Sequence, residues 1–488
     1  MTWILVALIV LVFFSAFLLA NTLRLHRHPD KVEAVELEKV DSHQIARHLA
    51  DVIQCQTISL PQLTEKDRQP WLKLHEVLKA NFPLFHQTLQ SQLINQYSLL
   101  YTWQGKEPSL APILFAAHQD VVPVDEDTLA EWKYPPYEGK IADGYVWGRG
   151  TLDMKSVLVT LMESAERLIQ SGYSPRRSIY FAFGHDEEIY GLQGALEISK
   201  WLERKGVRLA ALLDEGGLVT EEFIPGLKLP VALVSLGEKG FMTVKIQAQG
   251  KPGHSSMPPR QTAVGVVSRA LALLDDTPMP ARLRYIKPIL KGIAYGLPIL
   301  QQVMLANDWL FGRILIHRLE KEPELNAMLR TTSAATIFQS GVKDNVLPAQ
   351  AQAKVNFRLL PEEQVEDVLQ HIQKVVNDPR VNALLEDGYA WDASLISPAD
   401  VPAYYTLERV IKQVFSDIPV AHSLMRGASD ARHYQKICSH IYRFSPQYEL
   451  AQDVERVHGV NERIKVEDLG RMVNFYMRLM RVWGDAEF

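Results

Sequence analysis

Two adjacent carboxylates follow an apolar run near the middle of this chain. Residues 178–183 read as a buried strand, and Gly184-His185-Asp186-Glu187-Glu188 come directly after it. Neighbouring side chains leave a strand end in different directions, so one glutamate can hold a metal ion while the other faces a reacting water. The pair indicates metal-assisted hydrolysis if further ligands lie nearby.

Further side chains able to bind a metal also stand at or near the ends of apolar runs. His118 and Asp120 close the run 112–117, and Asp214 ends the run 209–213. Two more candidates lie in short motifs: Asp153 ends Gly148-Arg149-Gly150-Thr151-Leu152-Asp153, and His458 lies in Val457-His458-Gly459. Neutral imidazole and carboxylate oxygen are ligands that zinc takes in catalytic sites. The residue types therefore fit a catalytic zinc centre.

Helical patterns alternate with these strands. Between 153 and 172 the apolar residues recur at helical spacing, with Gly172 placed as a C-cap, and a second helix is predicted over 194–205. Alternating strands and helices are typical of an α/β fold with a mainly parallel sheet, whose functional groups gather at the carboxyl ends of the strands. We expect the candidate ligands to meet in one crevice.

Several long motifs, in order, resemble the M20 family of zinc peptidases, within the branch of carboxypeptidase S and the N-acyl-amino-acid hydrolases. They are Ala-His-Gln-Asp-Val-Val-Pro at 117–123, Trp-Gly-Arg-Gly-Thr-Leu-Asp-Met-Lys at 147–155, Gly-His-Asp-Glu-Glu at 184–188 and Leu-Asp-Glu-Gly-Gly at 213–217. The likeness covers nearly everything after the first forty residues. It implies a zinc-peptidase catalytic domain with an inserted α+β lid domain.

The resemblance also implies a site with two Zn²⁺ ions. Asp153 would bridge the ions, with Glu188 and His458 completing one, and His118 and Asp214 the other. Two dications are then balanced by three carboxylates and one hydroxide, so the cluster can sit in a cleft without an uncompensated charge. Some related enzymes carry a glutamate at the position of Asp214, which leaves the exopeptidase subtype open.

The residues left over receive catalytic roles. Glu187, by elimination and by resemblance, is the general base that takes a proton from the water at the metals and passes it to the leaving amine. Asp120 lies two residues past His118, so it faces the same side of the strand and would orient the imidazole through a hydrogen bond.

A domain boundary is expected near 236–240, where a new strand pattern begins at 241–246. We assign 41–236 and 399–488 to the catalytic domain and 237–398 to the inserted lid, with strands at 332–339 and 352–359 and a helix at 362–376. A mostly helical stretch, 281–325, interrupts the lid and has no evident task. In M20 enzymes the inserted domain is often also a dimer surface, so a homodimer through the lid is expected.

The resemblance assigns substrate contacts to the lid and to one catalytic-domain loop. His254 would donate to the oxyanion of the tetrahedral intermediate, Arg358 would grip a free carboxylate with Asn345 assisting, and backbone N–H groups of Gly427, Ala428 and Ser429 would bind the same carboxylate. The alternative for Arg358 is a surface arginine on a strand.

The function predicted is hydrolysis of the amide bond next to a free amino-acid carboxylate, as in a carboxypeptidase. An N-acyl-amino-acid amidohydrolase acting on fatty acyl amides stays open, as does an aminopeptidase or dipeptidase, although no anionic group is evident for a substrate ammonium. A binding protein on a peptidase fold would lack a ligand or the base, and neither is missing. Small peptides or N-acyl amino acids are the expected partners.

Composition narrows the choice of partners. A net charge of −5 gives no basic footprint for nucleic acid, so none is expected as a ligand. The two cysteines, Cys55 and Cys438, form neither a disulfide framework nor a metal-binding pair.

The first 23 residues form a predicted membrane segment, followed by a linker over 24–40. Residues 3–20 are apolar apart from Ser15, and as a helix they would be about 27 Å long, near the thickness of a bilayer core. A cleaved signal peptide is the alternative. Arg24, Arg27 and Lys31 follow the segment and favour a cytoplasmic catalytic domain, whereas the resemblance favours the extracytoplasmic side.

Overall fold

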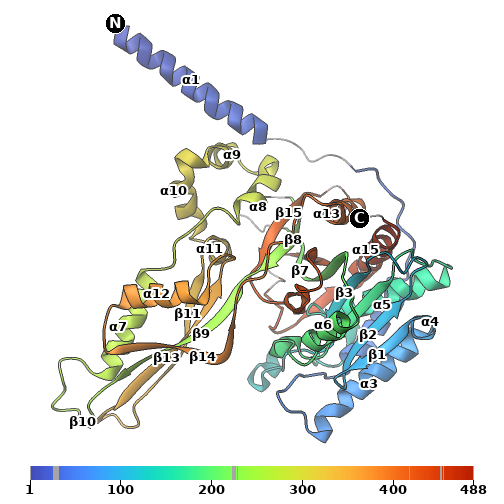
Figure 1. The fold of residues 1–488 in the computed structure, drawn as a ribbon, viewed down its shortest axis with the longest axis horizontal. Coiled ribbons are helices and arrows are strands. Elements are labelled where there is room, and N and C mark those ends of the chain that lie inside the picture. Colours follow the sequence, from blue (N-terminus) through green and yellow to red (C-terminus); the bar gives the residue numbers. More distant parts are fainter. Residues whose placement is uncertain are drawn as a thin grey trace.

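A computed structural model describes residues 2–25, 32–221, 227, 229–416, 418–450, 453 and 455–486. Two separate sheets organise this part of the chain, and the N-terminal helix projects away from both (Figure 1). The larger sheet carries the candidate ligands, and the smaller one belongs to the predicted lid.

The larger sheet has eight strands in the order β1-β2-β6-β3-β7-β16-β8-β15. Its bounds are β1 Gln90–Ile94, β2 Ser98–Trp103, β3 Ile113–His118, β6 Ile179–Gly184, β7 Ala211–Glu221, β8 Val231–Glu238, β15 Val420–Met425 and β16 Ile441–Leu450. Strands β6, β3, β7 and β16 are parallel to one another, whereas β1, β2 and β8 join antiparallel neighbours. The α/β class is confirmed, with a mixed sheet whose centre is parallel.

Strand β3 shows how the sequence builds the two layers around this sheet. Phe115 and Ala117 enter the core beneath α2 (Ser42–Ile53), α5 (Lys155–Gln170) and α15 (Val466–Asp485), whereas Leu114 and Ala116 face α6 (Ala195–Arg204) on the other side. Every residue of β3 is buried, as expected for a central parallel strand covered on both faces. His118 is the first residue at which this strand opens towards the site.

The remaining elements of the catalytic part pack around this sheet. Helix α13 contacts α15, and the expected helices 153–172 and 194–205 correspond to α5 and α6. The other helices are α3 Glu65–Asn81, α4 Pro83–Thr88 and α13 Pro402–Val414. A separate three-stranded sheet consists of β4 Lys140–Ala142, β5 Tyr145–Trp147 and β17 Arg463–Lys465, and the 3-10 turns are η1 Glu126–Glu131, η2 Glu187–Ile189 and η4 Asp430–Tyr434.

The smaller sheet is antiparallel, in the order β11-β13-β9-β14. Helices α7 and α12 pack on one of its faces and share a separate hydrophobic core with it. The bounds are β9 Gly240–Gln249, α7 Ala263–Asp276, β11 Thr332–Ser340, β13 Gln350–Leu359, α12 Val365–Val376 and β14 Val381–Trp391, with a two-stranded tip of β10 Gly253–His254 and β12 Val346–Leu347. The chain passes from one sheet to the other at Lys239.

The helical stretch expected at 281–325 does not join the core of the small sheet. It packs against β8 and β15 at the edge of the large sheet, where it shares a core with Leu233 and Ala421. Its elements are α8 Lys287–Gly292, η3 Ala294–Gly296, α9 Ile299–Ala306, α10 Asp308–Leu319 and α11 Pro323–Leu329. We call residues 281–329 the helical platform.

The predicted membrane segment forms helix α1, Thr2–Leu25, whose N-terminal part projects away from the rest of the chain (Figure 1). By length and composition it is able to cross a membrane, and a signal sequence near the N-terminus has the same properties. Of the predicted linker, residues 26–31 lie outside the described ranges, and Arg27 and Lys31 with them.

Candidate active site

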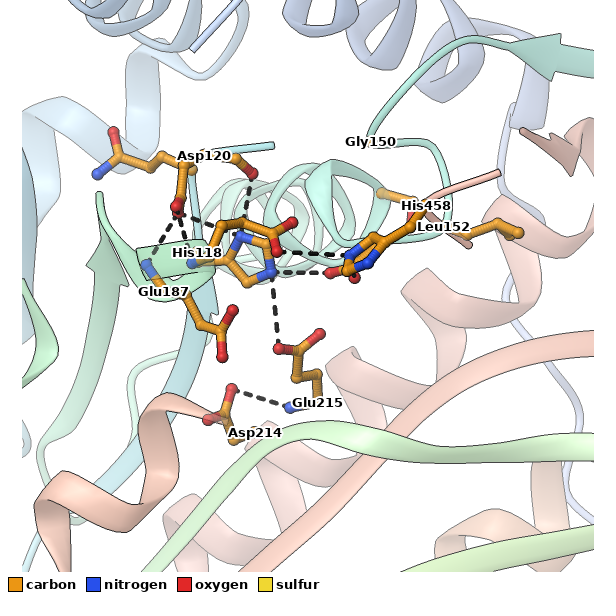
Figure 2. Close-up of polar contacts among 12 residues, drawn as sticks. His118, Asp120, Gly150, Leu152, Glu187, Asp214, Glu215 and His458 are labelled. Atoms are coloured by element: carbon orange, nitrogen blue, oxygen red, sulfur yellow. Dashed lines mark hydrogen bonds and ion pairs between the residues drawn. The ribbon is translucent and has the colours of Figure 1, made fainter. Parts of the chain in front are cut away.

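Three central strands deliver their carboxyl-terminal residues to one place (Figure 2). His118 ends β3, Glu187 and Glu188 form the turn η2 after β6, and Asp214 and Glu215 lie within β7. The loop before α5 adds Asp153, and His458 approaches from the segment before β17. The expected convergence of distant segments is therefore present.

Asp153 lies between the two histidines. Its Oδ1 is 2.8 Å from His118 Nε2, and its Oδ2 is 3.0 Å from His458 Nε2. The peptide bond between Asp153 and Met154 is cis. One carboxylate thus presents a separate oxygen to each imidazole, which is the arrangement that a bridging ligand requires.

The other carboxylates divide between the two histidines. Glu188 Oε2 is 3.4 Å from His458 Nε2, and Glu215 Oε1 is 3.6 Å from His118 Nε2. Two groups of residues could each hold a metal ion, because the potential ligand atoms within each group lie within 4.8 Å of one another. The first group is His118, Asp153 and Glu188, and the second is His118, Glu187 and Glu215.

Asp214 belongs to neither group. Its Oδ1 accepts a hydrogen bond from the backbone N–H of Glu215, and Figure 2 shows its carboxylate apart from both histidines. Burial raises the pKa of Asp214 to about 6. The residue that approaches His118 from this strand is therefore Glu215, which the sequence motif contains but to which no role was assigned.

Asp120 connects His118 with the turn that carries both glutamates. Its Oδ1 is 3.3 Å from His118 Nδ1, and its carboxylate accepts hydrogen bonds from the backbone N–H groups of Glu187 and Glu188 and from the Ser59 hydroxyl. The backbone oxygen of Asp120 is 3.0 Å from the same imidazole nitrogen. These contacts point His118 Nε2 towards Asp153, as the expected orienting role requires.

Glu462 holds the loop that presents Asp153. Its Oε1 accepts hydrogen bonds from the backbone N–H groups of Gly150, Leu152 and Asp153, and its Oε2 pairs with Arg149 at 2.6 Å. The side chain is fully buried. A buried carboxylate satisfied in this way fixes the loop in place, and nothing in the sequence spacing marks Glu462 for this task.

The cluster gathers several carboxylates in a buried place, and this shifts the pKa of its members. Burial and the neighbouring Glu215 carboxylate raise the pKa of Glu187, and burial raises that of Glu215 to about 8. Hydrogen bonds to Asp153 and Glu188 raise the pKa of His458 to about 10. Burial opposes the charged form of His118, but Glu215, Asp120 and Asp153 outweigh it and raise the pKa of the imidazole. Like-charged carboxylates crowded in this way favour a bound cation.

The donor atoms fit a metal. Imidazole nitrogen and carboxylate oxygen are the ligands of catalytic zinc sites. Glu188 Oε1 is buried and has no hydrogen-bond partner among the described residues, which is costly for a carboxylate oxygen unless a cation faces it. His118, Asp153, Glu188, Glu215 and His458 are therefore candidate ligands. Asp214 Oδ2 is likewise buried without a partner among the described residues, so Asp214 stays a predicted ligand beside Glu215.

Arg358 lies beside the catalytic turn. The carbon of its guanidinium is 4.7 Å from the centre of the Phe241 ring, which stacks on Trp391. Tyr190, three residues after Glu187, packs against both rings. Arg358 is half-buried beside these rings, and the Glu187 carboxylate is near enough to influence its pKa, which burial lowers.

The loop at 427–429 is only partly available to a ligand. The backbone N–H and the hydroxyl of Ser429 both donate to Glu238 Oε2, and Ser429 is fully buried. Both donors of Ser429 are thus used within the protein in this conformation, and its contact with a substrate carboxylate stays a prediction. Gly427 and Ala428 are half-buried and stay candidates.

His254 and Asn345 are not brought to the cluster. His254 is exposed in β10 at the tip of the small sheet, far from β3 and β7 in Figure 1, and its ring accepts hydrogen bonds from Ser256. The backbone oxygen of Asn345 accepts from Ser255 N–H beside it. The two residues stay together, but within one chain neither reaches Glu187.

The chain matches the model of "Peptidase family M20/M25/M40" over residues 114–482. The chain belongs to this family. It is 37% identical over 479 residues to "Probable carboxypeptidase S-like 2" of Dictyostelium discoideum, covering 95% of this chain and 91% of that protein. It is 38% identical over 451 residues to "N-fatty-acyl-amino acid synthase/hydrolase PM20D1" of Xenopus tropicalis, covering 91% and 87%.

Solved M20 structures share the fold. An "M20 family metallo-carboxypeptidase" from Sulfolobus solfataricus has a TM-score of 0.65 at 15% identity, covering 90% of this chain and 99% of that one. "Human carnosine dipeptidase 1" has a TM-score of 0.61 at 15% identity, covering 90% and 95%. The predicted family and its hydrolase function are confirmed, whereas the individual site residues stay predictions.

Proposed function

We propose that this M20 hydrolase cleaves the amide bond between an acyl or peptidyl group and an amino acid with a free carboxylate. Asp153, Glu188 and His458, together with His118 and Glu215, would hold two zinc ions. The observation that carries the proposal is Asp153, whose two oxygens each face a different histidine.

The chain supplies the proton transfers. Zinc at this site would lower the pKa of a water and polarise the scissile carbonyl. Glu187, raised in pKa by its buried position, takes the proton from the attacking water and delivers it to the nitrogen of the leaving amino acid. Asp120 fixes the Glu187 backbone and the His118 ring, so the base and the ligand keep their relative positions.

Arg358 is the proposed carboxylate group of the site. Its planar guanidinium is held by the Phe241 ring and can donate two parallel hydrogen bonds to a carboxylate. Such a contact selects an amino acid with a free carboxyl group over its amide or ester.

The test is Arg358→Lys, which keeps the charge but loses the fork. We expect kcat/KM for an N-acyl amino acid to fall by about 10- to 100-fold, as the loss of a charge-assisted bond of about 1.5–3 kcal/mol implies. Hydrolysis of the corresponding amide should hardly change. Arg380→Lys, on an exposed arginine that pairs with Asp378 in the turn before β14, is the matched control. Equal turnover of acid and amide by the unmodified enzyme would refute the carboxylate grip.

A fatty acyl substrate is the second candidate, favoured by a cavity next to the site. The cavity of about 200 Å³ begins at Gly216, which follows Glu215, and at Gly427. Part of its lining is apolar, with Leu218, Leu233, Met328, Leu424 and Met425, and part is polar, with Thr220, Ser235, Ser423, Glu324 and Arg426. The apolar part can take a hydrocarbon chain, and the relatives named N-fatty-acyl-amino acid synthase/hydrolase are consistent with this choice.

A homodimer through the lid would bring His254 to a site. Strand β11 is an edge of its sheet, and it exposes Ile337 and Phe338. An exposed apolar edge strand is a ready template for pairing with a second chain. We propose that His254 donates to the oxyanion in the partner's site, since it does not reach its own.

Complementation between two inactive variants tests this arrangement. Glu187→Gln and His254→Ala chains are each expected to form inactive dimers. When they are mixed and allowed to exchange, one site of each mixed dimer combines an intact Glu187 with the His254 of the other chain, so activity should return. Mixed dimers without activity would show that His254 acts within its own chain, whereas active His254→Ala dimers before mixing would show that it has no such role.

Helix α1 is proposed to be a retained membrane span. Its apolar length suits a bilayer core, and its side chains are exposed except near the end that contacts the helical platform. The extracytoplasmic side is proposed for the catalytic domain, from the resemblance to the carboxypeptidase S branch.

A further inference from the structure

The helical platform exposes an apolar face. On α9, Ile299 and Leu300 are 65% and 60% exposed, and on α10, Trp309 and Ile314 are 61% and 51% exposed. These large side chains occur within sixteen residues of sequence, and Leu310 lies among them. Soluble proteins rarely leave so many large apolar side chains of one helix pair in water, so this face is expected to contact something apolar.

The rest of the platform is arranged as in a helix pair lying on a surface. Leu315 and Leu319 of α10, and Met304 and Leu305 of α9, point into the shared core. Arg313 and Arg318 are exposed on α10 close to the apolar face. Apolar side chains with adjacent arginines are typical of helices that lie in a membrane interface with anionic lipid headgroups.

Helix α1 is seated on this same face. The Trp309 ring is 6.3 Å from that of Phe14 and 6.4 Å from that of Phe17. Asn307 is buried between the helices, where it accepts a hydrogen bond from Asn21 Nδ2 at 2.9 Å and donates to the Leu18 backbone oxygen at 3.2 Å. The platform therefore holds α1 by specific polar contacts at the end of its apolar run.

The position of these contacts sets a depth. The apolar run of α1 ends at Ala20, and Phe17 and Phe14 lie about 5 and 9 Å further along the helix axis. Interfacial helices bury their apolar faces about 5–10 Å into the boundary between headgroups and acyl chains. Trp309, packed against both phenylalanines, falls in this range, where tryptophan is enriched in membrane proteins.

We propose that the apolar face formed by Ile299, Leu300, Trp309, Leu310 and Ile314 inserts into the surface of a lipid bilayer, beside the point at which α1 leaves it. The depth rests on the proposed span α1, whereas the apolar face itself does not. The cavity near Gly216 is lined in part by Glu324 and Met328 of the same platform.

Site-specific quenching tests this proposal in the full-length chain. A single cysteine is placed at Ile314, labelled with a polarity-sensitive fluorophore, and the protein is reconstituted in phosphatidylcholine vesicles with and without spin-labelled lipid. The natural Cys55 and Cys438 are buried in the folded protein and are not expected to react. We expect the emission to shift to the blue and to be quenched by the spin-labelled lipid.

Two further positions separate the possible failures. Val342→Cys, 96% exposed near the end of the lid strand β11, is the control that should show neither change. Leu8→Cys reports whether α1 itself is in the bilayer. If Leu8 is quenched and Ile314 is not, the proposed insertion of the apolar face is refuted while the membrane span stands. If neither position is quenched, both the insertion and the span are refuted. A blue shift at Ile314 without lipid quenching would assign the face to a second copy of the chain instead.

If Ile314→Cys does not fold, Leu300→Cys gives the same reading from α9. Quenching at Leu300 supports the proposal, and its absence in vesicles that quench Leu8 overturns it.

Discussion

Replacing Glu187 with Gln is expected to lower kcat by at least about 100-fold while the metal content of the protein is unchanged. Glutamine keeps the shape of the side chain but cannot accept a proton from water. Glu187 lies within ligand distance of His118 and Glu215, so the measurement must combine steady-state kinetics with metal analysis of the same preparation.

The matched control for this prediction is Glu188→Gln, one residue later on the same turn. Glu188 faces His458 and carries a buried oxygen without a protein partner among the described residues, so this variant should lose metal together with activity. If Glu187→Gln loses metal and Glu188→Gln keeps it, the two roles are exchanged.

Removing the Glu215 carboxylate is expected to abolish tight binding of one metal ion, whereas Asp214→Asn should keep both. Losing an outer hydrogen-bond partner of a ligand costs about 10- to 100-fold in metal affinity, so losing a direct ligand should cost at least as much. Glu215→Gln and Asp214→Asn are isosteric and adjacent, so folding defects should be similar in both.

Metal titration of the two apo variants, monitored by metal analysis after dialysis, distinguishes them. If Asp214→Asn loses the second ion and Glu215→Gln keeps it, Asp214 is the ligand, as the motif predicts. The distances favour Glu215, whose Oε1 lies 3.6 Å from His118 Nε2, whereas Asp214 accepts from its neighbour's backbone.

The fold and most of the cluster were predictable because they follow from local rules. Buried apolar runs such as β3 end where a polar side chain begins, and parallel strands bring those ends together. The motifs were enough to predict that Asp153, Glu188 and His458 lie together. The choice between Asp214 and Glu215 is not predictable in this way, because neighbouring residues on a strand point to opposite faces and the sequence does not say which face meets His118.

Longer-range relations account for the other differences. Glu462 holds the Asp153 loop from more than 300 residues away along the chain, and no spacing indicates such a partner. The motif around Ser429 was recognised, but its donors are used by Glu238 in the core. His254 lies at the tip of the lid, beyond the end of the long strand β9. The sequence of one chain does not indicate what this tip contacts in a second chain.

The central claim is that a metal centre at Asp153 hydrolyses amides beside a free carboxylate. The most direct measurement is the turnover of an N-acyl amino acid and its C-terminal amide by one preparation, before chelation, after chelation and after adding Zn²⁺ back. We expect hydrolysis of the acid, much slower hydrolysis of the amide, loss of both on chelation and recovery with about two zinc ions per chain. Full activity in the chelated, metal-free protein, or equal turnover of acid and amide, would contradict the account.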